Sequence, residues 1–221
     1  MSFTIKAGET VAFVGATGAG KTTILSLLTR NYDVQKGTIY IDGIDIKKVK
    51  IQSLRKQIGQ MLQDVFLFSG TIRSNISLRD DDIPNGKIEK AASFVGANQF
   101  IEKLPLKYDE PVLEKGSNFS IGQRQLLSFA RTMVHEPKML ILDEATANID
   151  TETELLIQQS LEKMMSMGTM LIVAHRLSTI QHADKIIVLQ NGKIIEEGTH
   201  QALLKEKGYY YNLYRLQFEN E

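Results

Sequence analysis

Apolar runs alternate with helical patterns along most of the chain. Three short runs, at 10–14, 139–142 and 169–174, are predominantly apolar and rich in Val, Ile and Leu, which is typical of strands buried on both faces. Apolar residues at helical spacing follow the first run at 21–30 and precede the second at 123–135. Strand and helix in alternation predict an α/β fold with a parallel sheet covered by helices.

Turn signals predict a small antiparallel part beside the parallel sheet. Asn191-Gly192 separates the runs 185–190 and 193–196, and an Asn-Gly pair favours the tight turn of a hairpin. Asp42-Gly43 ends an alternating stretch in the same way. The sequence therefore predicts a hairpin over 185–196 and a tight turn at 42–43.

Two further helices are predicted outside the strongest patterns. A short helix is expected at 51–58. Thr151 and Glu154 have the spacing of a capping box, which predicts the start of a helix that runs to about Met165.

The pattern changes between about 70 and 119, where short helical pieces are broken by the polar run 79–82 and by Pro84-Asn85-Gly86. We therefore predict one domain over 1–221, built from a core lobe of 1–69 and 120–221 with a helical lobe inserted at 70–119.

The composition excludes several classes of function. The chain has 221 residues, and its 26 Lys and Arg balance 26 Asp and Glu, so it lacks the basic excess of nucleic-acid-binding proteins and no nucleic-acid partner is expected. The absence of Cys excludes disulfides and thiolate metal sites. No apolar run approaches the roughly 18 residues that cross a bilayer, so the fragment is expected to be soluble, with any membrane role supplied by a partner or by a missing segment.

A glycine-rich stretch between the first predicted strand and helix matches the P-loop pattern Gly-x-x-x-x-Gly-Lys-Thr. Glycines let such a loop wrap closely and point its N–H groups at phosphate oxygens, and the helix N-terminus adds partial positive charge. Lys21 then reaches the β- and γ-phosphates of ATP, and the Thr22 hydroxyl ligates Mg²⁺. The alternative is a chance glycine-rich turn, which the flanking strand and helix argue against. The predicted ATP-binding residues are Gly15, Ala16, Thr17, Gly18, Ala19, Gly20, Lys21, Thr22 and Thr23.

Two carboxylates, Asp143 and Glu144, directly follow the buried run at 139–142. Ligand sites in parallel sheets lie at the carboxyl ends of the strands. Asp143 is therefore placed to hold Mg²⁺, and Glu144 is placed to polarise an attacking water. By itself an Asp-Glu pair after a strand is more often a helix N-cap, but the P-loop upstream favours the catalytic interpretation.

Together these motifs resemble the nucleotide-binding domain of ATP-binding-cassette (ABC) transporters, and the resemblance covers nearly the whole chain. Gln63 or His175 alone would be read as a loop residue or a satisfied histidine, but their order and spacing follow the family. Gln63 resembles the Q-loop glutamine, 119–123 (Phe-Ser-Ile-Gly-Gln) the signature, 147–150 (Ala-Asn-Ile-Asp) the D-loop, and His175 the switch histidine.

The resemblance implies an ATPase that works as a pair. Ser120, Gly122 and Gln123 open a helix whose N-terminus can bind an anion, and in the family this end closes on ATP held by a second nucleotide-binding domain. Two domains sandwich two ATP molecules head to tail, and closure drives a transmembrane domain. The resemblance makes Glu144, His175 and Gln63 catalytic, with Thr22, Gln63 and Asp143 at the metal.

The segment 110–116 narrows the type of transporter. It resembles an exporter segment, usually Thr-Glu-Val-Gly-Glu-Arg-Gly, that touches the membrane domain; Val112, Glu114 and Gly116 match in place, and Lys115 keeps the charge. This implies an exporter, with the domain on the cytoplasmic side of the cell membrane in the full transporter.

Two departures from the family pattern carry predictions. The first is in the signature, where Ile121 replaces the first glycine and Phe119 replaces the leucine. We expect function to survive, and one hypothesis is a heterodimer with two unequal sites. ATPase turnover that rises with the square of protein concentration would instead favour a homodimer.

The second departure is that the P-loop lysine is already residue 21, whereas the family has earlier strands with an adenine-stacking aromatic. We expect a fragment of a longer transporter that binds ATP more weakly, because stacking contributes about 1–3 kcal/mol per base. Phe3 and Ile5 alternate in an expected edge strand at 2–6, with Phe3 in the core.

Three rival functions remain open. A DNA-repair or chromosome-organising ATPase shares the signature, but no heptad run separates Lys21 from Asp143. A translation-associated relative usually carries two cassettes, and this chain has one. A nucleotide-dependent dimerisation module without hydrolysis is disfavoured by the presence of both Glu144 and His175.

Overall fold

The computed structural model describes residues 1–62, 65–143, 150–173 and 177–218. The chain divides into two compact units. The first comprises Met1–Gln60, Lys138–Glu144 and Gly168–Glu221, and the second comprises Met61–Pro137 and Ala145–Met167.

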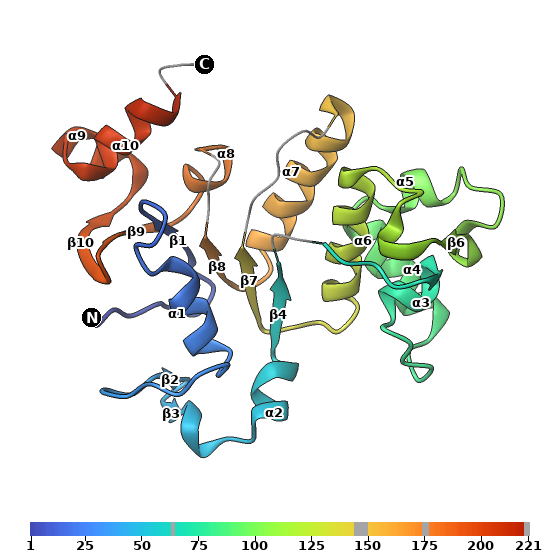
Figure 1. Cartoon of the computed structure of the whole chain (residues 1–221), viewed down its shortest axis with the longest axis horizontal. Helices are drawn as coiled ribbons and strands as arrows, with labels where there is room; N and C mark the ends of the chain where they lie inside the picture. The colour runs from blue at the N-terminus through green and yellow to red at the C-terminus, as the bar shows by residue number, and fades with distance from the viewer. Residues whose placement is uncertain (63–64, 144–149, 174–176, 219–221) are drawn as a thin grey trace. The chain divides into compact units, whose positions relative to one another are not determined.

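The first unit is built on a six-stranded sheet of order β10-β9-β1-β8-β7-β4. β1 pairs in parallel with β8 and with β9, β7 pairs in parallel with β8, and β10 runs antiparallel to β9. Figure 1 shows these strands side by side. The predicted α/β fold with a mostly parallel sheet is confirmed. The strands are β1 (Thr10–Val14), β4 (Ile58–Met61), β7 (Met139–Asp143), β8 (Thr169–Val173), β9 (Lys185–Gln190) and β10 (Lys193–Gly198).

The core of this unit lies between the sheet and helix α1 (Lys21–Leu28). Apolar residues of the strands pack against Ile24, Leu25 and Leu28, which share one face of the helix because of their spacing. Burial of each such side chain contributes about 1.5–3 kcal/mol. The same packing fixes the loop that joins β1 to α1, because both ends of that loop are held in the core.

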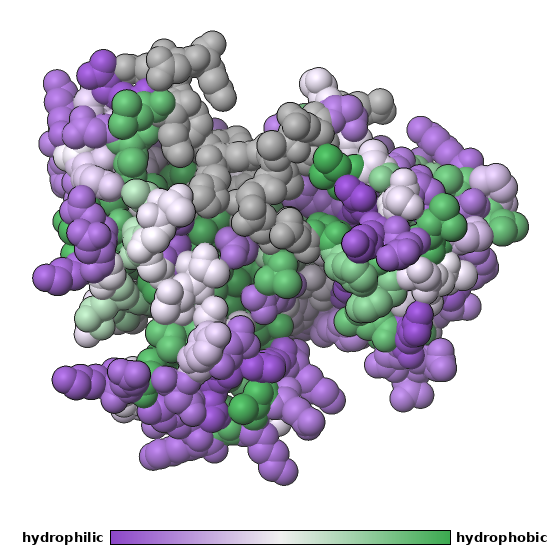
Figure 2. Space-filling model, viewed as in Figure 1, coloured by the Kyte–Doolittle hydropathy of each residue, from purple (hydrophilic) through white to green (hydrophobic). Residues whose placement is uncertain are grey.

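Smaller elements surround the sheet of the first unit. A hairpin, β2 with β3, turns at Asp42 and Gly43, whose φ values of 50° and 76° fit the predicted tight turn. Figure 2 shows hydrophilic side chains gathered over this hairpin and α2. Lys47, Lys48 and Lys56, in this part of the chain, are exposed. The elements are β2 (Tyr40–Ile41), β3 (Ile44–Asp45), η1 (Ile46–Lys48), α2 (Ile51–Lys56), α8 (Leu177–Ile180), α9 (His200–Glu206) and α10 (Tyr209–Phe218).

Two predictions in this unit were wrong. The expected strand at 2–6 does not form; Lys6 N donates to the Glu9 carboxylate and Lys185 Nζ donates to Thr4 O, so side chains take the place of a neighbouring strand there. Phe3 nevertheless packs on the core, with its ring centroid 5.6 Å from that of Phe13. The helix expected at 51–58 ends at Lys56, and Ile58 begins β4 instead.

The second unit is helical, with α6 in contact with α3, α4 and α7 (Figure 1). It extends beyond the helical lobe predicted at 70–119, because α6, whose buried apolar residues include Leu126, Leu127 and Phe129, contacts these helices. Its elements are β5 (Gly70–Thr71), α3 (Ile72–Ile76), α4 (Asn85–Phe94), α5 (Asn98–Ile101), η2 (Lys107–Asp109), β6 (Pro111–Val112), η3 (Glu114–Gly116), α6 (Ile121–Met133) and α7 (Thr151–Met165).

The predicted capping box of α7 was wrong by one residue. Asp150 is the N-cap, and its side chain accepts a hydrogen bond from Thr153 N at 2.9 Å. That hydrogen bond lowers the pKa of the Asp150 carboxyl group. A short carboxylate therefore outcompetes Thr151 for the unsatisfied N–H groups of the first turn.

Within the described parts of the chain, no helix combines the length and the apolar character needed to cross a membrane.

Candidate functional site

The loop between β1 and α1 is shaped by the close approach of its first glycine to β9. A Cβ atom at Gly15 would lie 2.3 Å from Leu189 O, closer than any side-chain atom can approach a carbonyl oxygen. Gly15 is therefore required by packing, while Ala16, Thr17 and Gly18 are exposed. The sheet thus fixes the base of the loop and leaves its rim accessible.

The rim and the helix start present backbone donors. Gly18 and Gly20 have φ values of 81° and 105°, which non-glycine residues rarely adopt, and Gly20 is the N-cap of α1. Within the described residues, the N–H groups of Gly18, Gly20 and Lys21 donate no hydrogen bond to other residues. Together with the partial positive charge of the helix N-terminus, these donors suit an anion such as a phosphate group.

Lys21 is covered by the loop that precedes it. Its side chain lies in a residue only 7% exposed, and Nζ donates to Gly15 O at 2.7 Å and to Ala16 O at 3.2 Å. Burial lowers the pKa of the Lys21 ammonium group, and the negative charge of Asp143 partly offsets this. A cation held inside the loop beside free N–H donors is complementary to a highly charged anion.

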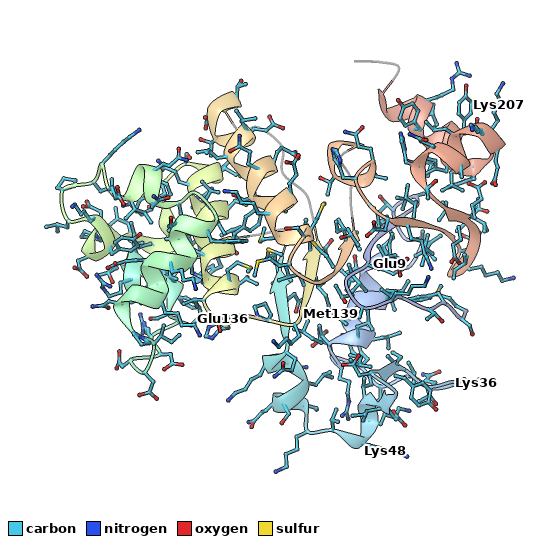
Figure 3. The ribbon with its side chains drawn as sticks, turned by 180° about the vertical axis from the view of Figure 1, so that it is seen from behind. Glu9, Lys36, Lys48, Glu136, Met139 and Lys207 are labelled. Atoms are coloured by element: carbon cyan, nitrogen blue, oxygen red, sulfur yellow. The ribbon has the colours of Figure 1, made fainter. Side chains whose placement is uncertain are left out.

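Asp143 is brought to the same edge of the sheet by strand register. Asp143 on β7 pairs with Val173 on β8, and β8 in turn pairs Val173 with Phe13, two residues before Gly15. With two strand spacings between them, β7 and β1 lie about 10 Å apart. Glu9, just before β1, and Met139, at the start of β7, are labelled in Figure 3; they mark the amino ends of these strands, at the opposite edge of the sheet. The carboxyl ends of these parallel strands therefore gather the loop and Asp143, as expected for a ligand site.

The hairpin turn between β9 and β10 supports the loop from outside. Gly192 N donates to Ala19 O at 3.1 Å, and Gly192 Cα lies 3.8 Å from the position of a Cβ atom at Gly20. Sequence reasoning identified Asn191-Gly192 as a turn but gave it no role at the P-loop. Only the pairing of β9 with β1 brings these distant residues together, so no local signal could have revealed the contact.

The predicted signature lies in the second unit, at the N-terminus of α6. Ser120 is the N-cap: its hydroxyl accepts from Gln123 N at 3.2 Å, while Ser120 N donates to Gln123 Oε1 at 3.0 Å. This capping box leaves the N–H groups of Ile121 and Gly122 without a hydrogen bond to another described residue. Ser120 is exposed and Gly122 is buried, so a ligand can reach this helix end from the side of Ser120.

Three predicted catalytic residues, Gln63, Glu144 and His175, lie outside the described residues, as does most of the predicted D-loop. The remaining predicted residues fall into two sets. Gly15 to Thr23 and Asp143 share one edge of the sheet in the first unit, with the Thr22 and Thr23 side chains exposed, and Ser120, Gly122 and Gln123 share one helix end in the second unit.

The family model described as "ABC transporter" matches residues 1–147. The chain belongs to the ABC transporter family. A solved structure, that of a bacterial Atm1-family ABC exporter with ATP bound, superposes with a TM-score of 0.91 at 42% sequence identity, covering 99% of this chain and 38% of that chain. The resemblance to the nucleotide-binding domain of an exporter-type ABC transporter, drawn from the motifs, is confirmed.

Curated relatives of this ABC family member match nearly all of its length. The putative ABC transporter ATP-binding protein exp8 of Streptococcus pneumoniae is 52% identical, covering 98% of this chain and 37% of the relative. The ATP-dependent lipid A-core flippase of Syntrophus aciditrophicus is 47% identical, covering 100% of this chain and 37% of the relative. The chain thus spans about a third of the length of the relatives that it matches.

Proposed function

We propose that the chain binds and hydrolyses Mg-ATP, and that ATP-driven head-to-tail pairing with a second nucleotide-binding domain powers an associated transmembrane domain. The observation that carries the proposal is the covered Lys21 ammonium group with Asp143 on the same sheet edge, in a loop where several N–H groups donate to no other described residue. The family match supports the same function.

ATP binding is assigned to the loop Gly15–Gly20 together with Lys21, Thr22 and Thr23. The N–H groups at the rim and the start of α1 hold the phosphates, and Lys21 neutralises the charge that grows on them during phosphoryl transfer.

The residues present fit a magnesium ion. The exposed Thr22 hydroxyl and the half-buried Asp143 carboxylate at the end of β7 are oxygen ligands of the kind that Mg²⁺ prefers; Gln63 is the third predicted ligand. When bound with ATP, the ion supplies charge neutralisation between the phosphate oxygens.

Hydrolysis is assigned to Glu144, His175 and Gln63. Glu144 accepts a proton from the attacking water and orients it, His175 holds the γ-phosphate, and Gln63 senses the metal and the water. Catalysis of this kind rests on positioning and on charge stabilisation rather than on a covalent intermediate.

Pairing is assigned to the signature end of α6. Ser120, Gly122 and Gln123 of one domain contact the γ-phosphate bound by the other, so each ATP is enclosed by two chains. The relatives include proteins named for multidrug export and for lipid A-core flipping, which supports an exporter. In this proposal the domain lies on the cytoplasmic side of the membrane, and the transmembrane domain carries the cargo path.

The test separates binding, pairing and hydrolysis with matched variants. Phosphate release, ATP affinity and gel-filtration size with and without ATP are measured for the wild type, Lys21→Ala and Glu144→Gln. Lys36→Ala and Glu206→Gln, which remove exposed charges in the first unit, serve as controls.

We expect Lys21→Ala to lose ATP affinity and turnover, and Glu144→Gln to keep affinity, lose turnover by about a hundredfold or more, and dimerise with ATP. Chelation of magnesium should stop turnover in the wild type, and both controls should behave like the wild type. ATP-dependent pairing without any wild-type turnover would instead establish the non-hydrolysing dimerisation module.

A further inference from the structure

The second unit holds a short segment, Val65–Ser69, by a side-chain clamp. Asn75 of α3 is 1% exposed, and its amide brackets Phe68: Phe68 N donates to Asn75 Oδ1 at 2.8 Å, and Asn75 Nδ2 donates to Phe68 O at 2.8 Å. Nδ2 also donates to Thr71 O at 3.0 Å. A single buried amide thus replaces the hydrogen bonds that a neighbouring strand would give this segment.

Arg131 of α6 completes the clamp from the other side. Its guanidinium group donates to Asn75 O at 2.8 Å, to Asn75 Oδ1 at 3.0 Å and to Phe66 O at 2.9 Å. It also lies under the Phe68 ring, 5.9 Å from the ring centroid. Burial lowers the pKa of Arg131. A buried charge is tolerated only when it is hydrogen-bonded, and the fork of the guanidinium group supplies several such hydrogen bonds at once.

The clamped segment presents two aromatic rings outward. Phe66 and Phe68 are each 49% exposed, their rings meet edge to face at 5.0 Å, and Leu67 between them is fully buried. These half-exposed aromatic residues form a stiff surface, because the clamp restricts the conformational freedom of their backbone.

The same helix that carries Arg131 begins with the predicted signature. α6 runs from Ile121 to Met133 behind its N-cap Ser120. A helix spans about 1.5 Å per residue, so Ser120 and Arg131 lie about 16 Å apart along one rigid element. A displacement of the segment that bears the rings therefore reaches the signature end of α6 through Arg131.

We propose that Asn75 and Arg131 are positioning residues that lock the Phe66–Phe68 segment to α6, so that the signature end of α6 and this aromatic surface move as one body. The inference rests on the proposed function, since it assigns the clamp a role in ATP-driven pairing and turnover. Both residues act through α6, the helix that begins at the predicted signature.

The experiment compares the chain with Asn75→Ala, Arg131→Met, Arg131→Lys and the double variant Asn75→Ala/Arg131→Met. Ser160→Ala is the matched control, because it removes a buried hydrogen bond to Val95 O in the same unit without touching the clamp. Amide hydrogen exchange of 65–69 and 120–124 is measured first. ATP turnover is then measured per bound nucleotide, which removes any effect of unfolded protein.

We expect Arg131→Met and Asn75→Ala to raise exchange in both segments and to lower kcat per bound nucleotide by about tenfold, with KM for ATP within about twofold of wild type. The double variant should lose no more than the worse single variant, since both residues serve one clamp. Arg131→Lys should restore only part, because an ammonium group cannot bridge the same acceptors.

Unchanged exchange at 120–124 in the clamp variants would overturn the proposal, as would an equal loss of kcat in Ser160→Ala. Hydrogen exchange requires no hydrolysis, so it tests the link through Arg131 even in a chain without ATPase activity. Absence of ATPase activity would count against the proposed function alone.

Discussion

The two units hold their predicted nucleotide-contacting segments in different ways. In the first unit, the loop between β1 and α1 is shaped by backbone: Gly15 sits against Leu189 O, and α1 begins directly at the end of the loop. In the second unit, the signature helix is tied to its surroundings by side chains, and Arg131 reaches Asn75 across 56 positions of sequence. A site shaped by backbone requires particular residues at neighbouring positions, so it can be recognised as a sequence motif. A clamp made by distant side chains leaves almost no such motif.

The largest effect expected from this difference is at Gly15. Gly15→Ala places a Cβ atom against a carbonyl oxygen of β9, and we expect it to destabilise the first unit by about 3 kcal/mol or more. Gly18→Ala is the matched control in the same loop: no atom lies within 4 Å of its Cβ position, and only its φ of 81° is unfavourable, so about 1 kcal/mol is expected.

Hydrogen exchange of β1 measures both glycine variants, since it reports the first unit separately from the second. Equal destabilisation by the two substitutions would show that conformational strain, rather than the approach to β9, decides the shape of the loop.

At the carboxyl end of the first unit, side chains rather than backbone hold a helix in place. Glu196 of β10 accepts hydrogen bonds from Tyr209 N and Tyr210 N at the start of α10, and the ring of His200 lies 2.7 Å from the Tyr210 hydroxyl through Nδ1. The ring of Tyr214 also contacts His200. Side chains therefore dock this helix, much as they hold the second unit.

This corner should respond to pH. Burial lowers the pKa of His200 below its ordinary value of 6.5, so just below that value the unfolded chain binds more protons than the folded chain. The stability from neutral His200 is therefore present at pH 7.5 and lost as the pH falls towards 5.5. Because the group is partly exposed and screened, the loss should stay below about 1 kcal/mol.

Urea unfolding of the wild type and of His200→Gln, at both pH values, checks this prediction. The wild type should lose more stability on acidification than the variant does, and the difference isolates His200 from the other histidines. Parallel losses in both proteins would assign the pH response elsewhere.

The sequence predicted the parts of the fold that depend on local pattern. Buried runs located β1, β7 and β8, and the Asn-Gly pair located the β9–β10 hairpin, because periodicity and turn chemistry are properties of neighbouring residues. The P-loop could be found for the same reason, since its glycines are needed where they stand.

What the sequence could not predict depends on contacts between distant residues. Gly192 beneath Ala19, and Asn75 between Phe68 and Arg131, join positions that no local pattern links. β4 was missed because its four residues, Ile-Gly-Gln-Met, have a weak strand pattern and gain their place from the sheet. Asp150 was missed as a cap because Thr151 offered an equally plausible spacing.

The smallest expected effect tests whether every buried polar side chain of the second unit stabilises its fold, as we expect of Asn75 and Arg131. Gln125 on α6 is 5% exposed, and its Oε1 has no hydrogen-bond partner among the residues that the structure describes. Gln125→Met keeps the volume and removes the unsatisfied acceptor, so we expect thermal unfolding to show stability unchanged or raised by up to about 1 kcal/mol. Thr132→Val, on the same helix, removes a hydroxyl that donates to Ser128 O at 3.1 Å and should lose about 1 kcal/mol. Equal losses in both variants would mean that polar groups stabilise α6 whether or not they are paired; opposite signs would confine the stabilisation to groups with partners, such as Asn75 and Arg131.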